Sequence, residues 1–131
     1  MKNTILIIDD EQSIRLLLEN FLSKDFQIIC KSDGIQALEW LEGNLPDLII
    51  CDVQMPNMDG REATRLIREK ESGTGAHVPI IALTALALKG DRELCIDAGM
   101  DGYVTKPVRR TQLLEAIDAA TGHLQVADRH R

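Results

Sequence analysis

The sequence lacks the features of a membrane or secreted protein. None of its apolar runs approaches the roughly 20 residues that a membrane-spanning helix needs. The first three residues lead directly into a strand pattern, which leaves no room for a signal peptide. We therefore expect a cytoplasmic protein without a membrane partner.

Basic residues are also scarce. Fifteen Lys and Arg stand against twenty-one Asp and Glu, for a net charge of −6. A sequence-independent nucleic-acid binder needs a concentrated basic face to neutralise phosphates. The composition thus argues against a nucleic-acid partner, and the modest acidic excess is compatible with a simple role in solubility.

The cysteines are few and lack the spacing of a metal site. Cys30, Cys51 and Cys95 stand in separate apolar stretches, with no close-spaced pair among them. We predict neither a disulfide framework nor a thiolate-bound metal, and interpret all three as small buried hydrophobic residues.

Length and composition indicate one globular domain. The chain has 131 residues, of which 44% are hydrophobic and 27% charged, and this size can bury roughly two-thirds of the unfolded surface. We place the domain at residues 1–122 and a polar C-terminal tail at residues 123–131.

Short apolar runs alternate with amphipathic helical patterns along the chain. Strands are predicted at residues 4–8, 26–30, 47–52, 78–84 and 102–105, and helices at 13–22, 35–41, 60–67, 89–98 and 111–120. Five strands alternating with five helices predict an α/β fold with a doubly wound parallel sheet and right-handed crossovers. For a chain this short, we expect the flavodoxin-like strand order 2-1-3-4-5.

Carboxylates follow two strands that this order makes neighbours. Asp9 and Asp10 follow the first strand, and Asp52 ends the third. Three converging carboxylates repel one another unless a cation lies among them or their pKa values rise. Because the nearby groups offer oxygen ligands without histidine or thiol, the pattern predicts Mg²⁺.

Two further polar residues end the fourth and fifth strands, at the same edge of the sheet. Thr84 supplies a hydroxyl and Lys106 a positive charge. Together with Mg²⁺, they provide what a phosphoryl group on Asp52 requires, namely charge neutralisation and a hydrogen bond. We therefore predict that Asp52 is a nucleophile that forms an acyl phosphate.

Several stretches in order carry a resemblance to a known family. They are the acid pair Asp9 and Asp10 and residues 52–60, 79–85 and 98–107. Over about residues 3–120, the chain resembles the response-regulator receiver domains of bacterial two-component signalling. Residues 87–93 and 98–101 are most similar to the receivers of hybrid sensor histidine kinases.

The resemblance implies a role for each matching residue. Asp52 corresponds to the phosphoacceptor, and Thr84 and Lys106 to the pair that contacts the phosphoryl group. Tyr103 corresponds to an aromatic switch residue that turns inward when Thr84 shifts. The implied metal ligands are Asp10 directly, Asp9 through water, Asp52 and the backbone carbonyl of Gln54. The family also implies a cis peptide bond between Lys106 and Pro107.

The implied function is a phosphorylation-controlled signalling switch. The domain would take a phosphoryl group from a sensor histidine kinase or a histidine phosphotransfer domain in a Mg²⁺-dependent reaction. It would not be an enzyme beyond its own phosphorylation and slow dephosphorylation. A downstream protein would bind the fourth helix, fifth strand and fifth helix, and the domain would be a monomer or a phosphorylation-dependent dimer.

Two positions depart from the family pattern. Leu86 stands where hybrid-kinase receivers often carry a polar residue, and an apolar group there could shield the acyl phosphate from water. We therefore expect slow autodephosphorylation that Leu86→Asn accelerates. Val108 follows the Lys-Pro pair where a larger side chain is common, which affects local packing but not the chemistry.

Other classes of protein remain as alternatives. A phosphohydrolase of the haloacid-dehalogenase type would carry a second acid two residues after its nucleophile, where this chain has Gln54. A flavodoxin-like cofactor binder would need a phosphate-binding loop after the first strand, where residues 9–11 are all acidic. A stand-alone regulator and a piece of a larger kinase are both compatible with the sequence. His77, His123 and His130 are isolated and receive no role.

Overall fold

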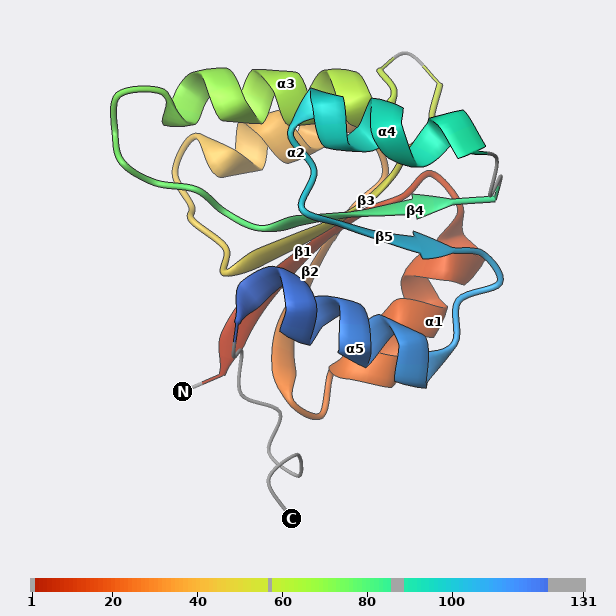
Figure 1. Ribbon diagram of the computed structural model, residues 1–131. Coiled ribbons are helices and arrows are strands. Elements are labelled where there is room, and N and C mark those ends of the chain that lie inside the picture. The colour runs from red at the N-terminus through yellow and green to blue at the C-terminus, as the bar shows by residue number, and fades with distance from the viewer. Residues whose placement is uncertain (1, 57, 86–88, 123–131) are drawn as a thin grey trace.

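The computed structural model describes residues 2–56, 58–85 and 89–122. In these ranges the chain forms one sheet of five strands and five helices (Figure 1). The strands are β1 (Asn3–Ile8), β2 (Phe26–Lys31), β3 (Leu48–Asp52), β4 (Ile80–Thr84) and β5 (Gly102–Thr105). The helices are α1 (Gln12–Leu22), α2 (Gly34–Leu41), α3 (Gly60–Glu71), α4 (Lys89–Ala98) and α5 (Arg110–Thr121).

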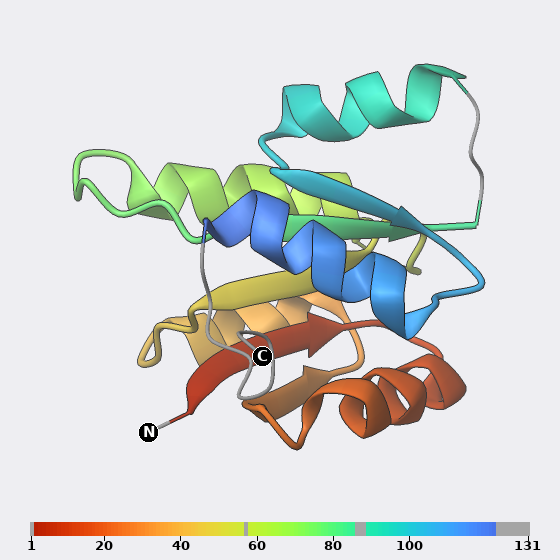
Figure 2. The same cartoon turned by 60° about the horizontal axis from the view of Figure 1, so that its bottom comes forward.

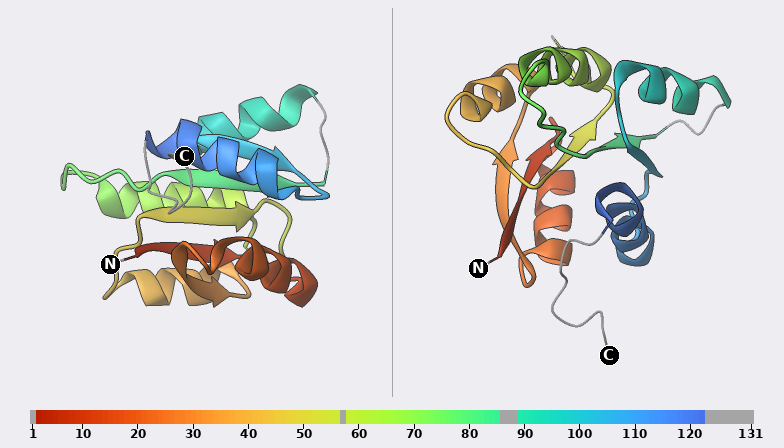
Figure 3. Two further views of the ribbon diagram at one scale, coloured as in Figure 1. Left: turned by 90° about the horizontal axis from the view of Figure 1, so that it is seen from below. Right: turned by 60° about the vertical axis from the view of Figure 1, so that its left-hand side comes forward.

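The sheet has the order β2-β1-β3-β4-β5, and every neighbouring pair is parallel. In Figure 2 the arrows of β1, β4 and β5 point to the same side. Helices α2, α3 and α4 cover one face, and α1 and α5 cover the other (Figures 1 and 3). The predicted α/β fold and strand order are confirmed.

The apolar strands form the core because both faces of the sheet are covered. All residues of β3 and β4 are buried. Successive side chains of a strand point to opposite faces, so Ile5 and Ile50 pack towards α1 and α5, whereas Leu6 and Ile49 pack towards α2 and α3. Because both faces of these strands are buried, their sequences are continuously apolar and do not alternate between apolar and polar residues.

The predicted elements all form, with small shifts at their ends. Helix α1 begins at Gln12 and α2 at Gly34, one residue earlier than predicted, while β4 begins at Ile80 directly after Pro79. Asp59 caps α3, since its side chain accepts hydrogen bonds from the backbone N–H groups of Arg61 and Glu62.

The cysteine prediction holds for two of the three residues. Cys51 and Cys95 are buried. Cys30 is half-buried, so its interpretation as a buried residue was wrong. The reason is its position on β2, which lies at the edge of the sheet and is less completely covered.

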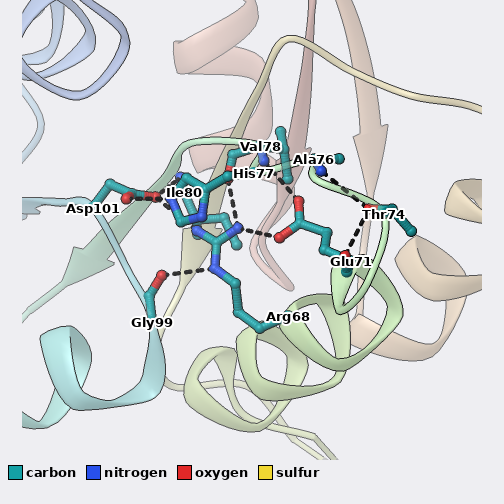
Figure 4. Close-up of polar contacts among 9 residues, drawn as sticks. All are labelled: Arg68, Glu71, Thr74, Ala76, His77, Val78, Ile80, Gly99 and Asp101. Atoms are coloured by element: carbon teal, nitrogen blue, oxygen red, sulfur yellow. Dashed lines mark hydrogen bonds and ion pairs between the residues drawn. The ribbon is translucent and has the colours of Figure 1, made fainter.

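A polar network centred on Arg68 joins α3 to the beginnings of β4 and β5 (Figure 4). The guanidinium group donates hydrogen bonds to the carbonyl oxygens of Gly99 at 3.0 Å and Val78 at 2.8 Å. It also forms ion pairs with Glu71 and Asp101, both at 2.7 Å. Arg68 thereby holds the C-terminal end of α4 against α3. These contacts lie at the N-terminal ends of β4 and β5, away from the C-terminal strand ends that carry the acids.

Asp101 extends this network to a histidine that received no role from the sequence. Its Oδ1 atom lies 2.7 Å from Nε2 of His77, and its Oδ2 atom accepts a hydrogen bond from the backbone N–H of Ile80 at 2.9 Å (Figure 4). The carboxylate therefore connects the turn after α4 to the first residue of β4.

Within the described ranges, each helix is too short or too polar to cross a membrane.

Candidate functional site

The three acids predicted to meet are brought together at the C-terminal ends of β1 and β3. These strands are paired, with Ile8 opposite Cys51, so the residues that follow or end them share one edge. One carboxylate oxygen from each of Asp9, Asp10 and Asp52 lies within 4.8 Å of the others. Asp9 and Asp52 are buried, with 0% and 3% of their surfaces exposed, whereas Asp10 is exposed. The cluster therefore has a buried interior and an open side.

Lys106 reaches this cluster from the end of β5. Its Nζ atom lies 3.3 Å from Oδ2 of Asp9 and 3.5 Å from Oδ1 of Asp52. It also lies 3.4 Å from Oε1 of Glu11, a contact that the sequence did not suggest. The Lys106-Pro107 peptide bond is cis, as predicted. The lysine thus forms ion pairs with two of the three acids of the site.

Thr84 and Tyr103 lie on neighbouring strands beside the cluster. Thr84 ends β4 and is 3% exposed, and its carbonyl oxygen accepts a hydrogen bond from the backbone N–H of Lys106 at 2.8 Å. Its side chain borders a cavity of about 380 Å³ that also reaches Cys95 of α4. Tyr103 is half-buried and borders a second cavity of about 310 Å³, likewise lined by Cys95. Each predicted switch residue therefore borders a cavity that is lined in part by α4.

Burial and mutual repulsion control the ionisation of the acids. Burial, together with the negative charge of Asp9, raises the pKa of Asp52 to about 7. Burial also raises the pKa of Asp9, although a backbone hydrogen bond from Glu11 and the charge of Lys106 oppose this shift. For Lys106, burial alone would lower the pKa, but the charges of Asp9 and Asp52 outweigh it and raise the pKa. Burial thus favours the protonated forms of Asp9 and Asp52, while the charges of these acids favour the protonated form of Lys106.

The donor set fits a hard divalent cation. Oδ2 of Asp9 is buried and accepts no hydrogen bond from the described residues, although Nζ of Lys106 lies 3.3 Å away. One carboxylate oxygen each from Asp9, Asp10 and Asp52 lies close to the others, and a set of oxygen ligands of this kind suits Mg²⁺. Asp9, Asp10 and Asp52 could hold the ion. The backbone N–H of Gln54 donates to Oδ1 of Asp52 at 3.2 Å, which places Gln54 beside the cluster, and the role of its carbonyl stays a prediction.

The sequence did not reveal how tightly the loop after β3 folds back. The backbone N–H of Gly60 donates to the carbonyl oxygen of Val53 at 2.8 Å. A Cβ atom at Gly60 would lie 2.3 Å from the carbonyl oxygen of Asp52, so a side chain cannot fit there. Gly60 thus lets α3 begin directly against the strand that carries Asp52. Leu86, for which we expect an effect on dephosphorylation, lies outside the described residues.

Comparison with known proteins identifies relatives of several lengths. The chain is 42% identical over 120 residues to hybrid signal transduction histidine kinase I of Dictyostelium discoideum, covering 87% of this chain and 7% of the kinase. It is 31% identical over 121 residues to the polar-differentiation response regulator DivK of Brucella ovis, covering 92% of this chain and 97% of the regulator. The chain thus spans only a small part of the first relative and nearly all of the second.

A solved structure extends the comparison to three dimensions. The receiver domain of sensor histidine kinase PA1611 from Pseudomonas aeruginosa PAO1, with a magnesium ion coordinated in its active-site cleft, is 39% identical. The alignment has a TM-score of 0.82 and covers 94% of this chain and all of that one. In addition, residues 5–118 match the family described as the response regulator receiver domain. The chain therefore belongs to the response regulator receiver domain family.

Proposed function

We propose that this domain accepts a phosphoryl group on Asp52 in a Mg²⁺-dependent reaction and acts as a phosphorylation-controlled switch. The observation that carries the proposal is the convergence of Asp9, Asp10, Asp52 and Lys106 at one edge of the sheet. The donor would be the phosphohistidine of a sensor histidine kinase or of a histidine phosphotransfer domain. This assignment draws support from the kinase receivers among the relatives.

The residues divide the chemistry among them. An ionised oxygen of Asp52 attacks the phosphorus atom, so that an O–P bond forms while the N–P bond to the donor imidazole breaks. The imidazole nitrogen keeps the bonding electron pair and takes up a proton. Lys106, whose Nζ lies 3.5 Å from Oδ1 of Asp52, is close enough to pair with the transferred phosphoryl oxygens. A bound Mg²⁺ would supply further positive charge to the carboxylates and the phosphoryl group.

The response to phosphorylation would pass through Thr84 and Tyr103. A phosphoryl group brings nearly two negative charges and strong hydrogen-bond acceptors. The Thr84 hydroxyl would move towards it and Tyr103 would turn into the vacated space, and the cavities on both sides of Cys95 leave room for that movement. The output surface would be formed by α4, β5 and α5. Leu94 and Ile96 of α4 are about half exposed and are available there to a downstream protein.

The proposal also covers activity, location and assembly. The domain would work in the cytoplasm, as a monomer or a phosphorylation-dependent dimer. Its catalysis would be limited to its own phosphorylation and a slow dephosphorylation, so it would not turn over a phosphate ester.

Intact-mass measurement after incubation with acetyl phosphate and Mg²⁺ tests the proposal directly. The native domain should gain the mass of one phosphoryl group, and Asp52→Asn should gain none. Chelation of the metal should abolish the gain in the native domain. Equal labelling of both proteins, an unlabelled native protein, or repeated turnover of a phosphate ester would refute the assignment.

A further inference from the structure

Helices α2 and α3 lie side by side on the face of the sheet opposite α1 and α5 (Figure 3, right). A cavity of about 440 Å³ opens between them, and its apolar lining comes from Ile35, Leu38 and Leu66. A second cavity, of about 270 Å³, lies at the C-terminal end of α2 and is lined in part by Leu45. Lys70 borders both cavities, so they lie next to each other along α2 and α3, and we call the two together the α2–α3 groove.

Two large apolar side chains of the groove are exposed to water. Ile35 is 50% exposed and Leu45 is 77% exposed. The second cavity is lined mostly by apolar side chains, including those of Leu41, Ile67 and Val78. Ile35 lines the first cavity and Leu45 the second, so each cavity has an exposed apolar side chain at its surface, and apolar surface of this kind next to a cavity can be covered by another molecule. Packing against a partner would remove Ile35 and Leu45 from water.

The charges around the groove indicate the chemistry of that partner. Glu39, Glu42 and Glu69 line the first cavity, against the single cation of Lys70. Three carboxylates next to an apolar floor favour a ligand with one apolar face and basic flanks. They disfavour nucleic acids and anionic lipid surfaces, which carry charge of the same sign.

We propose that the α2–α3 groove binds an amphipathic helix with basic flanks from a protein partner. Helix α2 has eight residues, which corresponds to about 12 Å, and the groove continues past its end to Leu45. A partner helix of about three turns matches this length. Its apolar residues at positions i, i+3, i+4 and i+7 contact Ile35, Leu66 and Leu45, while its lysines or arginines approach the glutamates.

The surface is distinct from those used in the proposed switch. The donor would approach the acidic cluster, and the output surface consists of α4, β5 and α5. The inference therefore stands on its own cavities and charges, and does not depend on phosphorylation of Asp52. A protein that binds the groove could remain attached in both states of the switch.

Chemical-shift mapping with a synthetic peptide tests the inference. The probe is a helical peptide of about 14 residues with leucines at positions i, i+3, i+4 and i+7 and lysines elsewhere. Its first control has the same composition in scrambled order, and its second has glutamates in place of the lysines. Added to the ¹⁵N-labelled domain, the probe should shift amide resonances of α2, α3 and the loop at Leu45. Both controls should bind at least tenfold more weakly.

Matched variants identify the contacts. Leu45→Gln and Ile35→Gln alter exposed side chains, so the fold should persist, and each should weaken peptide binding about tenfold. Glu39→Lys combined with Glu42→Lys should weaken it roughly fivefold at low salt. Leu16→Gln on α1 is the control, because it removes an exposed leucine that lies outside the groove. Leu16 is 57% exposed, and this variant should leave the peptide affinity unchanged.

Several outcomes would overturn the inference. These are absence of binding at millimolar peptide, shifts confined to α4, β5 and α5, and an affinity that the groove variants leave intact. Equal binding of the acidic peptide would reject the role of the glutamates. Binding to phosphatidylglycerol vesicles that Leu45→Gln abolishes would assign the groove to a lipid surface.

Discussion

Asp52 combines two requirements that oppose each other. The residue is 3% exposed, which would shield an acyl phosphate from water, yet the proposed reaction needs an ionised carboxylate. Burial and the charge of Asp9 hold its pKa at about 7, so a substantial fraction of the metal-free protein carries a protonated Asp52 at neutral pH. The positive charges of Lys106 and of a bound cation favour the ionised, reactive form.

The raised pKa predicts an unusual dependence of stability on pH. Between pH 4 and pH 7, folded Asp52 keeps a proton that the unfolded chain releases, so its contribution lowers the free energy of unfolding as the pH rises. At pH 8 without metal, Asp52→Asn should be more stable than the native domain by roughly 1–3 kcal/mol. Below pH 4 this difference should largely vanish. Urea unfolding in EDTA over this pH range measures it.

The matched control for this prediction is Asp97→Asn, which changes an exposed carboxylate on α4. It should leave the pH dependence of unfolding close to that of the native domain. If Asp52→Asn retained the same decline in stability between pH 5 and pH 8 as the native domain, the carboxylate of Asp52 would not be its source.

At the scale of the elements, the connection from β3 to α3 depends on close backbone packing. Gly60 begins α3 where a Cβ atom would lie 2.3 Å from the carbonyl oxygen of Asp52. Gly60→Ala should therefore destabilise the domain by about 1–3 kcal/mol and slow phosphorylation by acetyl phosphate, because the strand that carries Asp52 must shift. Gly43→Ala is the control, since nothing lies within 4 Å of its added carbon. Equal unfolding midpoints and rates for the two variants would contradict this explanation.

The contacts of Arg68 make α3 the anchor for two strands and for the end of α4. Arg68→Ala would leave the carboxylates of Glu71 and Asp101 without their cation, at side chains that are only 12% and 24% exposed. We expect a loss of roughly 2–4 kcal/mol in the free energy of unfolding. Arg65→Ala, at an exposed position of the same helix, should change it by less than about 0.5 kcal/mol.

Lysine cannot replace Arg68 fully, because it lacks the planar group that reaches several acceptors at once. Arg68→Lys should therefore fall between the native domain and Arg68→Ala in denaturant unfolding. A variant Arg68→Ala that unfolds at the same denaturant concentration as Arg65→Ala would show that the network of Figure 4 adds little to stability.

At the scale of the whole molecule, the proposed metal site at the cluster of acids would couple metal binding to folding. A cation that binds only the folded domain stabilises it by about 1.4 kcal/mol for each tenfold rise in concentration above its dissociation constant. The melting temperature of the native domain at pH 8 should therefore rise with Mg²⁺. Asp9→Asn and Asp10→Asn should each weaken this rise. A melting temperature that is independent of Mg²⁺ in the native domain would exclude the predicted site.

The sequence by itself determined the fold class, the strand order and the acids at the site. Each of these follows from local patterns, because a buried parallel strand is a continuous apolar run and the residue at its end must lie at one edge of the sheet. Asp9, Asp10, Asp52 and Lys106 meet there for that reason. The residue roles themselves came from a resemblance to a family.

Only the tertiary structure decided the contacts between residues far apart in the chain. Glu11 meets Lys106 across 95 positions, and Arg68 meets Asp101 across 33. The steric demand at Gly60 and the two cavities of the α2–α3 groove likewise depend on how the elements pack. Periodicity and spacing report the direction of a side chain within its own element. They carry no information about which side chain of another element it will touch, because that is set when the layers close on the sheet.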